Sequence, residues 1–343
     1  MKLSLFSTLR GYRKEYLPKD IFSGIIIAAV SIPISMGYAQ ISGIPAVYGL
    51  YGSVLPILLF ALFSTSRQFI FGVDAAPAAI VGGALSTLGI AAESEAAMDY
   101  VPAIALFAGL WLFIFFLLHA DKIVDFISTP VMGGFISGIA VTIILMQIPK
   151  LMGSPAGSGE LLELAGHIFA AAKTISWLSL FMGLGALVLI RTFKKLAPKF
   201  PMAIVIMALG VLSTVVFHVD EKGVVLLQSV ERGLPSLVIP DFGNIDLTQA
   251  AGRGLMVAVV IMAETLLAEN TFAFRNDYKL NDRQEILACA AGNIAAAAVG
   301  CCPVNGSISR TSLNEQYGGK SQAVSITAGI TMALILLFGT GFI

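Results

Sequence analysis

The sequence predicts an all-α integral membrane protein, and three observations support this fold class. Apolar residues make up 57% of the 343 positions and charged residues 12%, against about 45–50% and about 25% in soluble domains. The mean hydropathy is +0.87. Apolar stretches of roughly 20 residues, the length that a helix needs to cross a bilayer, recur along the chain. So few charges cannot cover a water-facing surface, and no sizeable soluble domain is expected.

The positions of these stretches predict eleven membrane helices. Ten lie at approximately 21–44, 46–66, 75–92, 100–118, 126–149, 174–190, 200–217, 254–274, 286–299 and 321–343, and the eleventh is a partial helix at 306–317. The segments 75–92 and 306–317 are expected to be discontinuous helices that begin inside the membrane. The last stretch runs to Ile343 without a flanking polar loop, so we expect the chain to be truncated there.

The charges and the reactive residues exclude several classes of protein. Lysine plus arginine and aspartate plus glutamate number 21 each, so the net charge does not predict a nucleic-acid partner. The cysteines and histidines lack metal-ligand spacing and no catalytic constellation is present, so we expect no metal, no cofactor and no enzyme. Lysines and arginines concentrate in segments on one side of the membrane, and the positive-inside rule then places the N-terminus in the cytoplasm.

The first departure from a plain spanning helix lies at residues 66–77. Residues 68–73 have β-like composition, and Gly72 permits a bend. Asp74 followed by Pro77 is typical of an N-cap and a first helical turn. We therefore expect a helix that starts after Asp74, inside the membrane.

The second departure lies at residues 300–311, where Pro303 and Gly306 interrupt the chain and a helix is expected to start at about 305–307. Irregular backbone at membrane depth is tolerated only when it is buried in protein or lines a cavity. Paired interruptions in two halves of a chain point to the binding site of a transporter. The breaks fall at the third and tenth expected helices, and this offset predicts a 7+7 inverted repeat.

Two half-helices that begin near the middle of the membrane would point their free N–H groups at each other across a gap. Each helix N-terminus carries about half a positive charge, so such a gap attracts an anion. We expect the first residues of the half-helices to contact this anion, namely Ala75, Ala76, Ser309 and Arg310. Arg310 adds a full positive charge. Packing kinks are the alternative explanation of the breaks, but they explain neither the pairing nor the arginine.

Motifs along the chain resemble those of the sulfate permease (SulP) family. The ordered set is Ile32-Pro33, Met36-Gly37-Tyr38-Ala39, Gly43-Ile44-Pro45, Gly49-Leu50-Tyr51, Ser64-Thr65-Ser66-Arg67, Glu264-Thr265, Asn281, Gln284-Glu285, Gly292-Asn293, Gly306-Ser307-Ile308-Ser309-Arg310-Thr311, Asn314 and Gly319-Lys320. The resemblance implies the fourteen-helix inverted repeat shared with uracil permease, in a homodimer of the bacterial cytoplasmic membrane. Helices 12–14 and the family's cytoplasmic STAS domain would be absent.

The resemblance also implies a division of the chain into a core and a gate. Residues 1–122 (helices 1–4) and 251–343 (helices 8–11) would form the core that carries the site. Residues 123–250 (helices 5–7) would form the first part of the gate. Transport would proceed by an elevator-like movement of the core against the gate.

Three residues outside the half-helices complete the expected site. Tyr38 matches the family's aromatic residue at the anion site, and Ser31 has a hydroxyl that can donate to an oxyanion. Glu264 lies near the middle of the eighth expected helix, where an ionised carboxylate costs about 2.5–3.5 kcal/mol. Two explanations stay open for so costly a residue: a carboxylate that carries a coupling proton, or a structural ion pair with Arg310.

These expectations favour a secondary carrier that takes up sulfate together with protons. Bicarbonate, coupled to sodium or protons, and C4-dicarboxylates are alternative substrates, because half-helix dipoles recognise negative charge and not shape. A passive anion channel on the same scaffold is the alternative mechanism, but a channel does not need an intramembrane acid such as Glu264. Sodium-coupled relatives have a hydroxyl one turn after this acid, where the chain has Ala268, and this difference favours protons.

Overall fold

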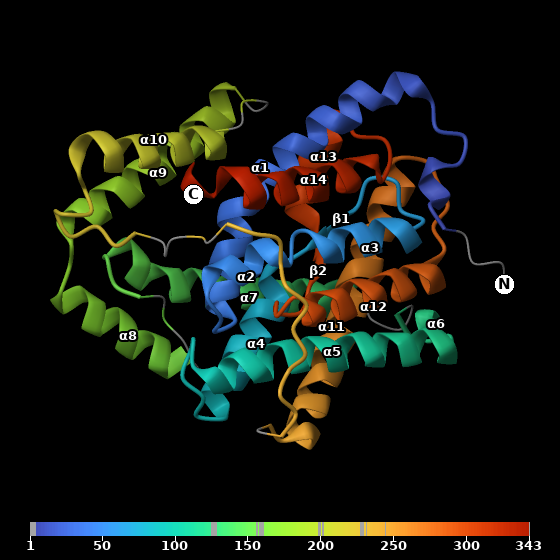
Figure 1. Cartoon of the computed structure of the whole chain (residues 1–343), viewed down its shortest axis with the longest axis horizontal. Coiled ribbons are helices and arrows are strands. Elements are labelled where there is room, and N and C mark those ends of the chain that lie inside the picture. The colour runs from blue at the N-terminus through green and yellow to red at the C-terminus, as the bar shows by residue number, and fades with distance from the viewer. Residues whose placement is uncertain are drawn as a thin grey trace.

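The chain folds into helices that follow the expected order, as seen in a computed structural model (Figure 1). The structure describes residues 5–124, 129–155, 157, 161–197, 200, 202–226, 230, 232–243 and 245–342. The longer helices are α1 (Leu17–Ile41), α5 (Glu95–Leu118), α7 (Thr129–Leu151), α9 (Trp177–Leu196), α10 (Met202–Phe217), α11 (Leu247–Arg275) and α12 (Asp282–Ala298). Among the described residues, five helical segments are long and apolar enough to cross a membrane.

Shorter elements complete the fold. The short α-helices are α2 (Ala46–Tyr51), α3 (Leu55–Phe63), α4 (Ala75–Thr87), α6 (Asp121–Val124), α8 (Leu161–Lys173), α13 (Ile308–Tyr317) and α14 (Ala323–Leu334). Single turns of other helix types are η1 (Ser7–Leu9), η2 (Lys14–Tyr16), η3 (Ile335–Gly339) and η4 (Thr340–Phe342). Two strands of three residues each, β1 (Ile70–Gly72) and β2 (Asn305–Ser307), lie in the interior.

Each of the eleven predicted segments contains at least one helix, with two differences from the prediction. The segment 46–66 is broken between α2 and α3, where the backbone at Gly52 packs so closely on Cys301 that a Cβ would lie 2.3 Å from its sulfur. The helices α6 and α8 fall where no membrane helix is predicted. Residues 126–128, 201 and 343 of the predicted segments lie outside the described residues.

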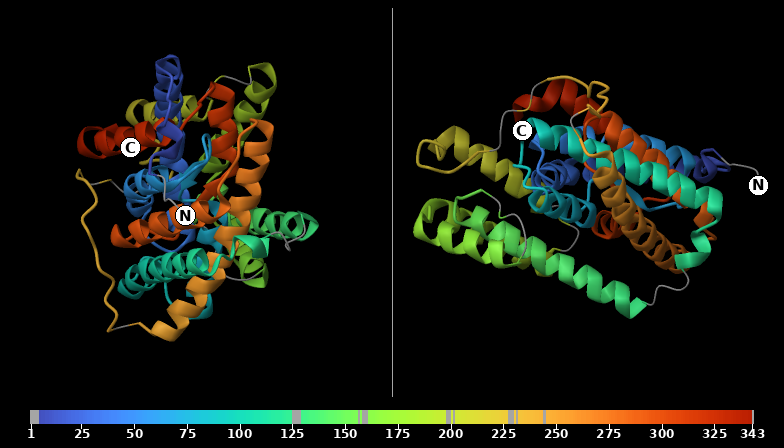
Figure 2. Two further views of the ribbon diagram at one scale, coloured as in Figure 1. Left: turned by 90° about the vertical axis from the view of Figure 1, so that its right-hand side faces the viewer. Right: turned by 90° about the horizontal axis from the view of Figure 1, so that it is seen from below.

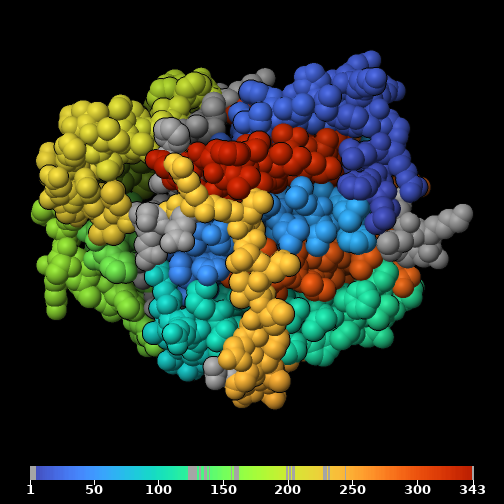
Figure 3. Space-filling model, viewed as in Figure 1, coloured from blue at the N-terminus to red at the C-terminus, as the bar shows by residue number. Residues whose placement is uncertain are grey.

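The core of the molecule is a layer of helices from both ends of the chain. The helices α14, α3, α12 and α5 lie side by side, from top to bottom in Figure 3. α1 packs on α14, and α11 packs on α5. The segment 232–243 crosses this layer, where the Val238 N–H donates to the Ala298 carbonyl at 2.8 Å. N-terminal and C-terminal segments are thus interleaved, as an inverted repeat requires.

The helices α8, α9 and α10 gather at one end of the molecule, on the left of Figure 1 and of the right-hand view in Figure 2. Within α9 no residue is buried, and large apolar side chains such as Trp177 and Phe181 are exposed. An apolar helix with no buried face is stable in lipid and not in water. This part of the chain therefore has the surface of a membrane protein.

The two strands bring the predicted breaks together. β1 and β2 pair antiparallel, with Ile70 opposite Ser307, Phe71 opposite Gly306 and Gly72 opposite Asn305. Pairing satisfies backbone groups that would otherwise be buried without partners. Each strand leads directly into a helix, β1 into α4 and β2 into α13. The same strand–helix unit therefore occurs in each half of the chain, with the two helices starting close together.

Candidate anion-binding site

The first break places the N-terminus of α4 next to the strand pair. Asp74 is the predicted N-cap, and its side chain accepts a hydrogen bond from the Ala75 N–H at 2.9 Å. Pro77 has no N–H, and the Ala78 N–H bonds to the Asp74 carbonyl at 3.4 Å. Within the part of the chain that the structure describes, the Ala76 N–H has no acceptor. An anion at this terminus would find that donor free.

The second break is held open by an amide from α12. The Asn293 side chain accepts from the Val304 N–H and donates to the Val304 carbonyl, both at 3.0 Å. Extended backbone is stable here because these bonds and the strand pairing replace helical ones. Residues 305–307 therefore form β2, and the helix predicted to start there begins at Ile308.

Arg310 joins the two breaks. Its side chain is 2% exposed. Nη2 donates to the Val73 carbonyl at 2.8 Å, and Nη1 donates to the Ser31 hydroxyl of α1 at 3.4 Å. A Cβ on Gly72 would lie 3.0 Å from Nη1, so the missing side chain makes room for the guanidinium. The arginine of α13 thus lies against the entry to α4.

The charge of Arg310 is not neutralised by an ion pair within the described chain. The salt bridge found there joins Arg275 and Glu315 at 2.7 Å. Asp74 acts on Arg310 electrostatically, while the Arg310 Nε is buried without a hydrogen-bond partner. A buried cation without a paired anion is costly. The site is therefore electrostatically suited to a bound anion.

Glu264 has a neutral partner in place of a cationic one. Its Oε2 accepts from the Asn305 Nδ2 at 2.7 Å, and the Asn305 Oδ1 accepts from the Thr265 hydroxyl at 2.6 Å. No ion pair with Arg310 is present among the described residues. The structural ion pair considered from the sequence is therefore not present among the described residues, where the partner of Glu264 is the amide of Asn305.

The other predicted residues surround this centre. Tyr38 is partly buried and interacts electrostatically with Arg310 and Glu264, so its hydroxyl lies among the charged groups. Ser309 is exposed and lies on the open side of the first turn of α13. Ala75 is partly buried and Ala76 is buried. The fold thus brings segments from α1, α4, α11 and α13 to one place.

Sequence reasoning missed the amides that shape the site. Asn305 partners Glu264, and Asn293 holds the backbone of the second break. Both are polar residues at membrane depth, where an unsatisfied polar group costs several kcal/mol. That cost is a signal that could have singled out Asn293 within α12.

Metal binding has no obvious location in the described part of the chain. No group of three or more histidine, cysteine, aspartate or glutamate side chains there could hold a metal ion. Cys289, Cys301 and Cys302 are buried free thiols. The polar groups of the site are hydroxyls, amides, one guanidinium and two carboxyls.

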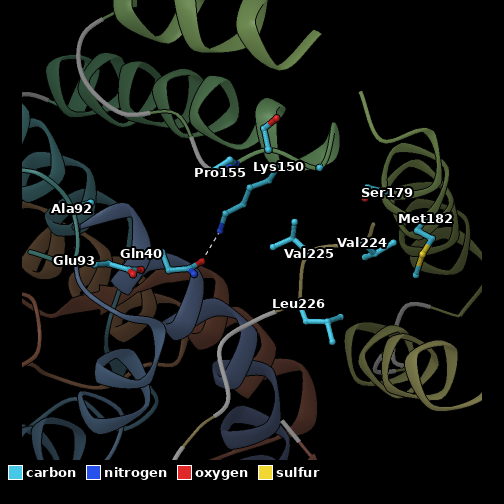
Figure 4. Close-up of a pocket in the computed structure, with 12 residues that line it drawn as sticks. Gln40, Ala92, Glu93, Lys150, Pro155, Ser179, Met182, Val224, Val225 and Leu226 are labelled. Carbon is cyan, nitrogen blue, oxygen red and sulfur yellow. Dashed lines mark hydrogen bonds between the residues drawn. The ribbon is translucent and has the colours of Figure 1, made fainter. Parts of the chain in front are cut away.

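A cavity of about 640 Å³ opens beyond the C-terminal part of α1 (Figure 4). Figure 4 shows Lys150 of α7 extending toward Gln40, and its Nζ donates to the Gln40 Oε1 at 2.7 Å. Ser179 and Met182 of α9 lie on the far side. The cavity therefore lies between α1 and the helices of the expected gate.

Paired half-helices with a buried arginine between them define a class of protein, the secondary carriers with binding sites at broken helices. The comparison with protein families gives the particular family. A family model described as the sulfate permease family matches residues 17–343. The chain belongs to this family, which is one of transporters and not of enzymes.

Curated relatives carry names that agree with the family. A probable sulfate transporter of Mycobacterium tuberculosis is 27% identical over 97% of this chain and 60% of its own length. Sulfate transporter 4.1 of Arabidopsis thaliana, a chloroplast protein, is 30% identical over 98% of this chain and 50% of its own length. The chain thus spans about half to three fifths of the relatives that it matches.

Solved structures share the fold. The transmembrane domain of the cyanobacterial bicarbonate transporter BicA has a TM-score of 0.84 at 19% identity, covering 96% of this chain and 85% of that one. Murine Slc26a9, an anion transporter solved in an inward-facing state, has a TM-score of 0.86 at 18% identity, covering 98% and 59%. The fold of the chain is therefore the 7+7 inverted-repeat transporter fold.

Proposed function

We propose that the protein takes up sulfate together with protons, and that the anion binds between the N-termini of α4 and α13. The observation that carries the proposal is the buried guanidinium of Arg310, which contacts the Val73 carbonyl at the entry to α4 and has no ion pair in the described chain. A dianion placed there gains from one full charge and two helix dipoles.

Several donors support the binding geometry. The Ala76 N–H at the start of α4 has no acceptor among the described residues, and Ser309 is exposed on the first turn of α13. The hydroxyl of Ser31 accepts a hydrogen bond from Arg310, and Tyr38, also on α1, interacts electrostatically with Arg310. Oxyanions need several hydrogen-bond donors around them, and these residues supply donors from three separate elements.

Glu264 is the proposed carrier of the proton. Its partner is the neutral amide of Asn305, and no cation among the described residues pairs with it to offset an ionised carboxylate at this depth. Asp74 also acts on Glu264 electrostatically, and a second negative charge favours the protonated acid. An incoming anion adds further negative charge. Proton and anion binding would therefore favour each other.

Movement of a core against a gate is the proposed transport step. Residues 1–122 and 251–343 form the proposed core, and residues 123–250 belong to the proposed gate. The cavity between α1 and the helices α7 and α9 lies along this division, which supports it as an access route. We extend the proposal to a homodimer in the bacterial cytoplasmic membrane with a cytoplasmic N-terminus.

Bicarbonate and C4-dicarboxylates are the alternative substrates, and the similarity to BicA favours the first of them. The test is uptake of labelled sulfate into proteoliposomes, competed by unlabelled sulfate, bicarbonate or fumarate. Sulfate should be transported and should compete at the lowest concentration. Transport of bicarbonate or fumarate without sulfate transport would contradict the proposed substrate.

A passive channel is the alternative mechanism on the same scaffold. It predicts large anion currents across a planar bilayer and no dependence on Glu264. A carrier should give slow flux that Glu264→Gln uncouples from protons. Channel-sized currents that persist in this variant would contradict the carrier.

A further inference from the structure

Two carboxyl groups away from the anion site are buried against each other. Glu269 of α11 and Glu285 of α12 are both 0% exposed, and their side chains interact. Glu269 follows Glu264 by five residues, which places it roughly 140° around the helix. The pair therefore lies on another face of α11 from the residue proposed to carry the coupling proton.

Glu285 accepts hydrogen bonds from the segment before β1. The Ser64 hydroxyl lies 2.7 Å from Oε2, and the Thr65 N–H and hydroxyl both bond to Oε1. Each hydroxyl itself accepts a backbone N–H, Ser64 from Ser66 and Thr65 from Asn281. Their own protons are thus directed at Glu285, which receives three donors. A carboxyl with three donors is stable as the ionised, acceptor-only form.

Glu269 has the opposite environment. Both of its oxygens are buried without a hydrogen-bond partner among the described residues. An ionised carboxylate in this position would carry its charge without a single donor, next to a second carboxylate. Desolvation and like charge both disfavour that state. The neutral acid, whose O–H can be donated, is the form that fits.

The other groups that act on the pair among the described residues include no cation. Asp282 and Cys289 come from α12, and Asp282 accepts from the Asn270 amide at 2.9 Å. Tyr278 lies in the loop between the helices, where burial raises the pKa of its phenol. Arg67 is exposed and lies over the Tyr278 ring, 5.3 Å from its centroid. The Arg67 guanidinium is thus directed at a ring.

We propose that Glu269 and Glu285 bind one proton between them, forming a second proton-binding site that is separate from Glu264. The proton stays on Glu269, whose O–H donates to the carboxylate of Glu285. This bond ties α11 to α12 and, through Ser64 and Thr65, to the strand that positions α4. Loss of the proton at alkaline pH would put two negative charges in contact and weaken the connection between α11, α12 and the strand before α4.

The first test compares stability against pH for the wild-type protein, Glu269→Gln and a control, Glu221→Gln, at an exposed position. A glutamine at 269 can donate an N–H to Glu285, which mimics the protonated acid. The folded pair binds its proton more tightly than the unfolded chain, so the unfolding constant should rise by up to tenfold per pH unit above about pH 4.3 until that proton is lost. In Glu269→Gln this rise of the unfolding constant with pH should be absent, and in Glu221→Gln it should equal that of the wild type.

The second test measures the proton directly by infrared spectroscopy, in a Glu264→Gln background that removes the other proposed proton site. A protonated-carboxyl band should persist at neutral pH and disappear when Glu269→Gln is added. Absence of the band in Glu264→Gln, or its persistence in the double variant, would overturn the proposal. So would a pH slope in Glu269→Gln equal to that of the wild type. Neither measurement depends on proton-coupled uptake, so the transport proposal can fail separately.

Discussion

Replacing Arg310 with glutamine should weaken anion binding by about 100-fold per unit of anion charge, and so by about 10,000-fold for the sulfate dianion. The guanidinium lies 2.8 Å from the Val73 carbonyl, three residues before the free N–H of Ala76. Taking a separation of about 6 Å between the guanidinium and a bound anion, two unit charges interact by about 3 kcal/mol at an effective dielectric constant of about 20. Each 1.4 kcal/mol is about tenfold in Kd, which gives about two decades per unit of anion charge.

Isothermal titration of sulfate into the purified protein measures this loss. Arg310→Lys keeps the charge but not the planar fork of donors, so its Kd should lie between those of the wild type and Arg310→Gln. Arg275→Gln is the matched control, because Arg275 is half-exposed and paired with Glu315 outside the site. An unchanged sulfate Kd in a folded Arg310→Gln protein would refute the site.

Three further predictions follow from individual contacts. Glu264→Gln should abolish the stimulation of uptake by an inward proton gradient while sulfate binding is kept; stimulation equal to that of the wild type would exclude Glu264 as the proton carrier. Gly72→Val would place a side chain against the Arg310 Nη1, which lies 3.0 Å from the position of a Cβ. This crowding should cost about 1–3 kcal/mol of stability, so the melting temperature and the sulfate affinity should both fall. A sulfate Kd equal to that of the wild type would contradict the contact. Tyr12→Phe removes a 2.9 Å hydrogen bond to the buried Asp20 and should cost about 1 kcal/mol. Burial and Asp20 raise the pKa of Tyr12 from 10.0 to about 12. The difference in stability between the wild type and Tyr12→Phe, measured by thermal unfolding, should therefore have its full size below about pH 10 and vanish as the pH passes about 12. A pH-independent difference would contradict this reasoning.

The breaks in the membrane helices could be predicted because their causes are local. Asp74 before Pro77, and Pro303 before Gly306, interrupt helices wherever they occur. The break inside 46–66 has a local signal that was missed, because Pro56 in the first turn of α3 cannot donate to the carbonyl of Gly52. The close approach of Gly52 to Cys301 from the other half of the chain could not be predicted. Position in sequence carries no information about such contacts.

The charged residues of the candidate site could be predicted from the sequence, but the hydrogen-bond partners of those residues could not. Arg310 is singled out by the cost of a cation at membrane depth and by its place after a break. The partner of Glu264 is Asn305, 41 residues along the chain, and this pairing depends on how β2 packs on α11. Sequence alone therefore left an ion pair with Arg310 open, and the tertiary structure replaced it with an amide.

The extra helices show the limit of hydropathy as a guide. α8 runs from Leu161 to Lys173 and carries Glu163 and His167 as well as apolar residues. A helix that is apolar on one face only gives no span-length apolar stretch. Such helices are missed when only membrane spans are sought.

Uptake of labelled sulfate into proteoliposomes, with and without an inward proton gradient, tests the central claim most directly. The account predicts uptake that rises with the gradient in the wild-type protein and is lost in Arg310→Gln, with Arg275→Gln unaffected. Sulfate uptake that ignores the gradient, or that survives in Arg310→Gln at the wild-type rate, would contradict it.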